Sequence, residues 1–269
     1  MLVPRVLLVP HLPTLLLDQH RGHRTPMIAA LEAAAERLLA EAPEVVVALS
    51  ARWDSTGPFL ADASARLRTI TDYAGFGVEV RYDCDGDPGL ARALVLAGQK
   101  ARLRVAAAIR GVDSGITVPL HFLFPQRGVR VVPLSLAPRP APECRAWGAC
   151  LRRALAARPE RAVFLVGGLL SNNHHAWNLG REVPAARAFD EQAIAALTHG
   201  AWGDLTAASD AAAEAQPEAG MRHVEVLRGF LGEAAAGELR CYEPSPGVGS
   251  ALIEFEVAPG VATRPSPAA

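Results

Sequence analysis

Residues with catalytic or metal-binding chemistry follow two apolar runs near the start of the chain. His11 comes shortly after the run 6–9, and Ser50, Arg52 and Trp53 follow the run 45–49. A histidine can bind a metal or transfer a proton, whereas an arginine binds anions. Open α/β sheets bind their ligands outside the carboxyl ends of their strands. These residues are therefore candidates for one functional site.

Further candidates lie in the loops 110–115 and 171–175 and at Glu243. Each has an ordinary structural interpretation beside the functional one. Asp113 can bond its own backbone in the turn before Gly115, His11 can be satisfied by nearby backbone, and Glu243 can simply end a strand. What favours a site is that five separate segments bring polar side chains to the same predicted edge of a sheet.

The run 45–50 is apolar without alternation, which indicates a strand buried on both faces. Before it, Thr25 and Pro26 are typical of a helix N-cap and first turn, and this helix is expected to reach about residue 42. Together with a strand at 6–9, these elements predict a right-handed β-α-β unit with parallel strands.

The rest of the chain repeats this alternation. The further predicted strands are 59–71, 78–82, 104–109, 129–136, 162–166, 239–243 and 251–257; the further predicted helices are 87–101, 119–124, 142–157 and two or three within 184–235. The sequence thus predicts one α/β domain over residues 1–257, with a central mostly parallel or mixed sheet and helices on both faces. Residues 258–269, rich in Pro and Ala, are expected to form a flexible tail.

Composition restricts the classes of function. The chain has 269 residues, half of them apolar, and a formal net charge of −1. This charge does not provide the excess of basic residues that is typical of proteins that bind nucleic acid or an anionic membrane. No apolar run is long enough to span a bilayer and no signal peptide is evident, so we expect a soluble, cytoplasmic protein. The four cysteines form no C-x-x-C pair, which favours reduced thiols over a zinc site or disulfides.

Common catalytic motifs of α/β proteins do not occur in the sequence. It contains no G-x-S-x-G elbow, no G-x-G-x-x-G and no P-loop, so neither a hydrolase nor a nucleotide-binding protein is favoured. Ser171, after Gly167 and Gly168, is a weak candidate nucleophile.

The order and the amino-acid sequences of these loops resemble those of the class III extradiol ring-cleavage dioxygenases. This family is related to the β subunit of protocatechuate 4,5-dioxygenase and to Memo-like proteins. The similarity includes Asp113-Ser114-Gly115 and Tyr242-Glu243-Pro244 and runs through nearly the whole chain. The matching segments are 9–13, 49–53, 72–76, 110–115, 118–120, 132–136, 167–169, 189–190 and 242–244.

This resemblance implies a non-haem Fe(II) held by two histidines and a carboxylate, with open positions for a catecholate and oxygen. His11 matches the first iron ligand and Glu243 is expected to match the carboxylate. The second histidine ligand is replaced by Arg52, which has no lone pair for a metal.

The catalytic loops also depart from the family pattern. The family's Asp-His-Gly is Asp113-Ser114-Gly115 here, and the acid–base histidine after Gly-Gly-Leu has only His174 and His175 nearby, slightly displaced.

Three hypotheses remain open at this point, and with them whether the chain is an enzyme. In the first, the protein is a non-catalytic or divergent subunit without iron, and Arg52 pairs with Glu243. In the second, a shifted Fe(II) site uses His11, Glu243 and one of His20, His23, His174 or His175. In the third, a pocket formed by Ser50, Arg52, Trp53, His20 and His23 binds an aromatic or anionic ligand without redox chemistry. The resemblance also implies a homodimer or a heteromer with a second dioxygenase subunit.

Overall fold

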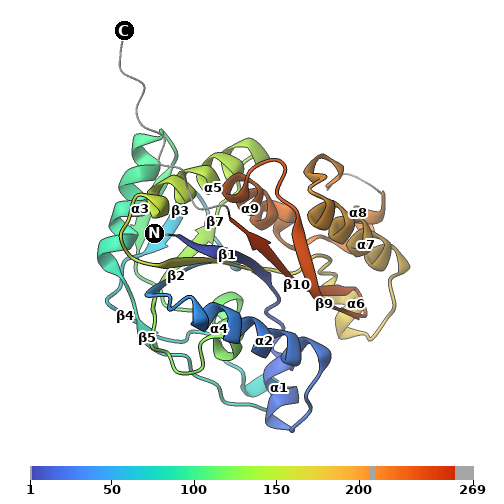
Figure 1. The fold of residues 1–269 in the computed structure, drawn as a ribbon. Helices are drawn as coiled ribbons and strands as arrows, with labels where there is room; N and C mark the ends of the chain where they lie inside the picture. The colour runs from blue at the N-terminus through green and yellow to red at the C-terminus, as the bar shows by residue number, and fades with distance from the viewer. Residues whose placement is uncertain (1, 206–209, 258–269) are drawn as a thin grey trace.

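An eight-stranded mixed sheet forms the centre of the molecule, as the ribbon in Figure 1 shows. The computed structural model describes residues 2–205 and 210–257. The strands are β1 (Leu2–Val9), β2 (Val45–Asp54), β3 (Phe59–Asp62), β6 (Val105–Ala108), β7 (Arg130–Leu136), β8 (Ala162–Gly167), β9 (Gly237–Ser245) and β10 (Val248–Glu256), in the order β6-β3-β7-β2-β8-β1-β10-β9. β4 (Arg66–Leu67) and β5 (Cys84–Asp85) pair separately.

The middle of the sheet is parallel. β2 runs parallel to both β7 and β8, and β8 runs parallel to β1, so that Val47 lies between Val132 and Phe164. β10 and β9 add antiparallel strands at one side of this parallel core. The predicted single α/β domain with a mostly parallel sheet is confirmed, whereas the predicted tail 258–269 lies outside the described residues.

Helices cover both faces of the sheet (Figure 1). One face packs against α3 (Pro88–Lys100), α5 (Ala141–Ala156), α7 (Pro184–His199), α8 (Asp210–Ala215) and α9 (Arg222–Leu231), and the other against α1 (Thr14–His20), α2 (Pro26–Ala40) and α4 (Ser114–Leu123). Short helical segments are η1 (Ala74–Phe76), α6 (His174–Asn178), η2 (Trp202–Asp204) and η3 (Glu218–Met221). Among the described helices, none is long and apolar enough to cross a membrane.

Two predicted strands are corrected by the structure. Residues 78–82 form no strand, and 59–71 contain only β3 and the two-residue β4. The alternation of apolar and polar residues at 78–82 arises because Val78 and Tyr82 are buried in an irregular segment. Tyr82 forms its hydrogen bonds with residues that do not belong to a neighbouring strand. The Tyr82 N–H donates to Thr69 Oγ1, and the Tyr82 hydroxyl donates to the carbonyl of Phe124.

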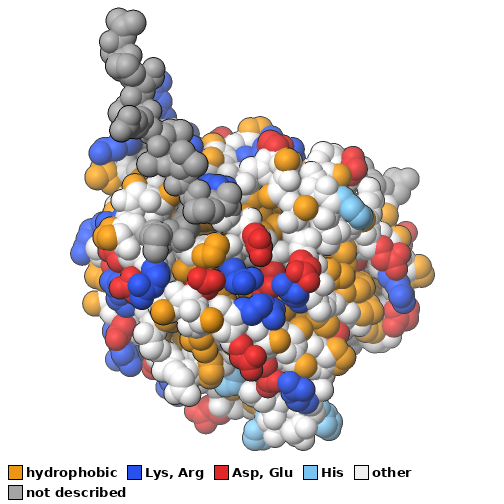
Figure 2. Space-filling model, in the orientation of Figure 1, with side chains coloured by type: hydrophobic (Ala, Val, Ile, Leu, Met, Phe, Trp, Pro, Cys, Tyr) orange, Lys and Arg blue, Asp and Glu red, His pale blue; other side chains and the backbone are white. Residues whose placement is uncertain are grey.

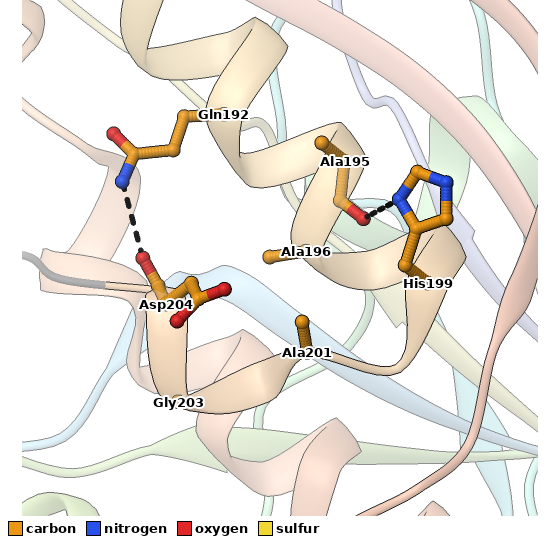
Figure 3. A pocket seen from close by; sticks show the side chains of 7 residues that line it. All are labelled: Gln192, Ala195, Ala196, His199, Ala201, Gly203 and Asp204. Carbon is orange, nitrogen blue, oxygen red and sulfur yellow. Dashed lines mark hydrogen bonds between the residues drawn. The ribbon is translucent and has the colours of Figure 1, made fainter.

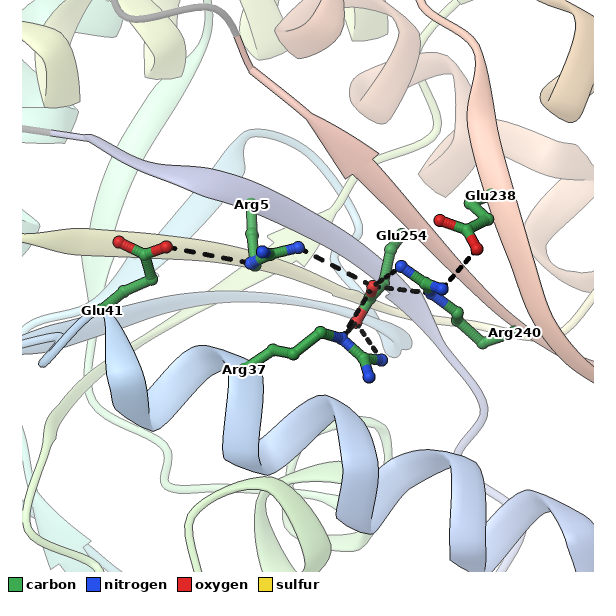
Figure 4. Close-up of polar contacts among 6 residues, drawn as sticks. All are labelled: Arg5, Arg37, Glu41, Glu238, Arg240 and Glu254. Carbon is green, nitrogen blue, oxygen red and sulfur yellow. Dashed lines mark hydrogen bonds and ion pairs between the residues drawn. The ribbon is translucent and has the colours of Figure 1, made fainter.

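One buried glutamate on β10 lies among three arginines, which come from β1, α2 and β9 (Figure 4). Glu254 has a side chain only 3% exposed; Arg37 and Arg240 reach it at 2.8 and 2.7 Å, and Arg5 at 4.0 Å. Arg240 also pairs with Glu238, and Figure 2 shows acidic and basic side chains intermixed on this face. The positive charges of these arginines are therefore balanced by the carboxylates of Glu254, Glu238 and Glu41.

α5 and α9 approach each other through glycines. A Cβ on Gly148 would lie 1.9 Å from the carbonyl oxygen of Val226, and one on Gly229 would lie 1.9 Å from that of Arg145. Real side chains cannot occupy these distances, so the helices can pack this closely only because both positions lack a Cβ.

We predict that Gly148→Ala lowers the free energy of unfolding by about 1–3 kcal/mol, because the helices must move apart. Gly89→Ala in α3 is the matched control, since its Cβ would meet only Asp87 Oδ1 at 3.4 Å; this change should leave stability equal or raise it by up to about 1 kcal/mol. Urea unfolding of both variants measures the difference. Equal stability of the two variants would contradict the close helix contact.

Candidate functional site

A small pocket lies at the carboxyl ends of β1, β2 and β8, where the sequence predicts a site. Its volume is about 140 Å³. The polar residues that line it are His11, Arg52, Thr71, Ser114, Asn172 and His174; the apolar ones are Leu12, Pro13, Phe76, Leu169, Trp177 and Val248. Residues far apart in sequence therefore meet around one cavity.

The most buried polar contact of this pocket joins His11 to Glu218. The Nε2 atom of His11 lies 2.8 Å from Glu218 Oε2 and 3.0 Å from Oε1, and both side chains are about 95% buried or more. The backbone N–H of Leu169 donates to the same carboxylate at 2.6 Å, and the Asn172 amide donates at 3.3 Å. Glu218 is thus held by the residue that follows β1 and by the loop after β8.

Glu218 stays ionised at neutral pH. Burial alone would raise the pKa of its carboxyl, but the charge and hydrogen bond of His11, with the hydrogen bond from the Leu169 N–H, lower that pKa to about 2. An ionised carboxylate only accepts hydrogen bonds, so Nε2 of His11 must carry a hydrogen.

Sequence reasoning missed Glu218. It lies in η3, within the stretch 184–235 that was expected only to form helices, and it is 207 positions away from His11. The left-handed backbone at Ala219, Gly220 and Met221 turns the chain there before α9 begins. A local pattern could indicate this turn through Gly220, but not the distant histidine that Glu218 contacts.

Glu243 lies elsewhere. Its Oε1 accepts a hydrogen bond of 2.8 Å from the backbone N–H of Met27, in the first turn of α2. Such an N–H has no partner within its own helix, and a carboxylate also suits the positive end of the helix dipole. The carboxylate that meets His11 is therefore that of Glu218, and Glu243 stabilises the start of α2.

Arg52 contacts a histidine rather than an acid. Its Nη1 lies 3.4 Å from Nε2 of His174, and the described part of the chain contains no carboxylate paired with it, so the expected Arg52–Glu243 pair is not formed. Burial, and then the charge of Arg52, lowers the pKa of His174. His174 and His175 are both exposed, and only His174 lines the pocket.

A group of buried contacts lies next to the pocket lining and involves Ser50, Trp53 and Asp113. The Ser50 hydroxyl donates to Asp113 Oδ1 at 2.7 Å, and Arg110 pairs with the other oxygen of Asp113 while its guanidinium lies 4.8 Å over the Trp53 ring. These three residues are buried and do not line the cavity, although Ser114 does.

The two histidines of α1 and the loop after it are remote from this arrangement. His20 and His23 are exposed and do not line the pocket, and Nδ1 of His23 lies 3.8 Å from Asp18 Oδ1. The structure therefore does not bring them to His11, as the shifted metal site or the predicted anion pocket would require.

A larger hollow lies at the surface beside α7 and η2, with a volume of about 580 Å³ (Figure 3). Its side chains are already engaged locally: Gln192 donates to the Asp204 carbonyl, and the ring of His199 bonds the Ala195 carbonyl. It is larger than the His11 pocket but offers no comparable group of buried polar residues.

The donor set of the His11 pocket does not fit Fe(II). Over the described ranges 2–205 and 210–257, no three residues among His, Cys, Asp and Glu are grouped to hold a metal. A ferrous site of this kind needs two imidazoles and a carboxylate. His11 and Glu218 provide one of each and are bonded to each other. The second imidazole of the pocket, His174, contacts Arg52 and is not grouped with them, and Arg52 provides only donors and a positive charge.

Residues 5–253 match the family described as the catalytic LigB subunit of aromatic ring-opening dioxygenase. The chain belongs to this family. LigB-family proteins are extradiol dioxygenases that typically use non-haem Fe(II), so this chain is an extradiol dioxygenase homologue.

Two curated relatives carry dioxygenase names. The chain is 29% identical over 129 residues to a 4,5-DOPA dioxygenase extradiol of Beta vulgaris, and 28% identical over 159 residues to the dioxygenase tasH of Hapsidospora irregularis. The alignments cover 43% and 57% of this chain and 48% and 46% of those proteins. The chain thus matches about half the length of each relative.

A solved structure shows the same fold. The crystal structure of an uncharacterized protein from Escherichia coli K12 superposes with a TM-score of 0.64 at 19% identity, over 95% of this chain and 100% of that one. This similarity shows the fold alone. The chemistry of the pocket has to be argued from the residues that line it.

His223, at the start of α9, is completely buried next to Gly168, whose added Cβ would lie 2.3 Å from His223 Cδ2. Among the described residues, neither ring nitrogen meets a hydrogen-bond partner. Burial lowers the pKa of His223 from 6.5 to about 4, against the opposing charge of Glu218. The folded protein therefore keeps this ring neutral at pH values where the unfolded chain protonates it.

A lowered histidine pKa makes stability fall as pH decreases, because only the unfolded state binds the proton between the two pKa values. From pH 7 to pH 5 we expect His223 to contribute a loss of about 2 kcal/mol in the free energy of unfolding. His223→Leu should remove this contribution, and His20→Leu at an exposed position should not. Urea unfolding at several pH values checks this; parallel pH profiles for wild type and His223→Leu would contradict it.

Proposed function

We propose that this LigB-family protein has lost the iron site and acts as a non-catalytic, ligand-binding member of the family. The observation that carries the proposal is the direct His11–Glu218 hydrogen bond, with Arg52 lining the same pocket. Arg52 stands where the family resemblance requires the second histidine ligand.

Electrostatics opposes a ferrous ion in this pocket. Fe(II) would have to separate His11 from Glu218 and bind beside the guanidinium of Arg52, which stays protonated at all ordinary pH values. Two cations bound side by side repel each other. Arg52 thus supports a binding pocket in which a fixed cation is part of the protein.

The remaining residues can bind and orient a ligand. Arg52 offers N–H donors and Ser114 offers a hydroxyl. Ser114 also stands where the family resemblance places a histidine, so that position provides no imidazole for proton transfer. These groups favour recognition of a small molecule over cleavage of its ring.

Anaerobic Fe(II) titration of metal-free protein, followed by calorimetry, tests this proposal. We expect no saturable binding to wild type at micromolar concentration, and measurable binding by Arg52→His, which supplies the missing imidazole. Arg153→His, at an exposed position of α5, is the control for an added surface histidine. Stoichiometric, tight Fe(II) binding by wild type, with oxygen uptake on a catechol, would contradict the proposal.

A further inference from the structure

We infer that the outer edge of β6 binds an extended acidic peptide segment of another protein, which adds to the sheet as a further strand. This edge combines unpaired backbone groups at Ala107 and Ile109 with a local excess of basic side chains. No residue of β6 lines the His11 pocket, so this binding surface goes beyond the function proposed above.

β6 is the last strand at one side of the sheet, and β3 is its partner there. The carbonyls of Arg104 and Ala108 accept hydrogen bonds of 2.9 Å from the N–H groups of Phe59 and Ala63, so these alternate residues direct their backbone groups toward β3. Neighbouring residues of a strand direct theirs to the opposite side. The N–H and C=O groups of Ala107 and Ile109 therefore point to the outer edge.

This outer edge is accessible to another chain. Ala107 is exposed, and Ile109 is 87% exposed. The side-chain amide of Gln99 donates to the carbonyl of Val105, but the described residues offer no hydrogen-bond partner to the backbone of Ala107 or Ile109. Unpaired edge groups of this kind are a template for a strand from another chain.

Basic residues gather around this edge without acidic ones. The stretch 88–112, which contains α3 and β6, has five basic residues and no Asp or Glu. Arg110 is paired with Asp113, whereas no described carboxylate pairs with Lys100, Arg102 or Arg104, all of which are exposed. The surface at the start of β6 is therefore positively charged, and an acidic segment complements it.

The positive surface continues onto the helices beside β6. α3 contacts the strand directly, since a Cβ on Gly98 would lie 2.5 Å from Val105 Cγ2. Between α3 and α5 lies a hollow of about 430 Å³, whose charged lining residues are Lys100 and Arg153. An acidic side chain at the end of a bound peptide can therefore meet a cation on either helix.

The same charges disfavour a second copy of this chain as the occupant. Two β6 edges in contact would bring two identical, positively charged surfaces together. Like charges opposed across an interface repel each other and suppress such an association. A peptide with Glu or Asp beside apolar residues avoids this repulsion and can also cover Ile109.

Fluorescence anisotropy with labelled peptides at low ionic strength tests the inference on the full chain. A peptide of alternating Glu and Val should bind saturably, and added salt should weaken it. A peptide of alternating Lys and Val reverses the charge, and one of alternating Glu and Pro keeps the charge but cannot pair as a strand. Both should bind at least about tenfold more weakly. Equal affinity for the Glu–Val and Glu–Pro peptides would overturn the inference.

Substitution of Ala107 tests the backbone contact. Ala107→Pro removes an outward N–H and should weaken binding of the Glu–Val peptide about tenfold. The fold should tolerate this change, because proline is accepted where the N–H of an edge strand faces solvent. Ala107→Val keeps the N–H and is the matched control, which should bind like wild type. Unchanged affinity in Ala107→Pro contradicts strand pairing at β6.

Substitution of Arg104 tests the charge. Arg104→Glu should weaken binding of the Glu–Val peptide and strengthen binding of the Lys–Val peptide. Arg181→Glu, at an exposed position after α6, is the matched control and should change neither affinity. Equal effects of the two charge reversals would show that net charge alone, and not this edge, determines binding.

Hydrogen exchange of the wild-type protein locates the peptide without any substitution, and it decides the matter if Ala107→Pro does not fold. The Glu–Val peptide should slow amide exchange at Ala107 and Ile109 at least about tenfold, because pairing protects these N–H groups from solvent. Protection elsewhere with none in β6 would refute the inference. Oligothymidylate is the competing polyanion: if it binds as tightly as the Glu–Val peptide and Ala107→Pro leaves both affinities unchanged, the basic surface serves nucleic acid and the inference fails.

Discussion

The buried hydrogen bond between His11 and Glu218 is the interaction on which the pocket depends. It joins the end of β1 to the turn before α9, and the Leu169 N–H on the same carboxylate ties both to the loop after β8. A buried charge is costly unless it is paired and hydrogen-bonded, so this carboxylate requires all its partners at once. The pair thereby fixes the geometry of three segments that are distant in sequence.

Arg52 contributes a positive charge to the same pocket. The family to which the chain belongs typically uses non-haem Fe(II), a metal cation. In this protein the guanidinium of Arg52 lines the cavity and contacts His174. The two cations differ in what they can do. Iron accepts lone pairs and has open positions for reaction, whereas a guanidinium donates hydrogen bonds in a fixed plane and is suited to carboxylates.

The sequence predicts much of the fold because buried strands have a local signal. The apolar runs that became β1, β2 and β8 are recognisable without tertiary information. Glu218 was not predictable in this way, because its role comes from a contact across 207 positions. The alternation at 78–82 was misinterpreted, since an irregular segment that buries Val78 and Tyr82 produces the same pattern as a strand.

The most direct test of this account is a crystal structure of the protein after anaerobic soaking in Fe(II), with anomalous data collected at the iron edge. The account predicts no anomalous peak at the pocket and an intact hydrogen bond between His11 Nε2 and the Glu218 carboxylate, near the 2.8 Å observed here. An iron peak coordinated by His11 and Glu218, with Arg52 turned away, would contradict it.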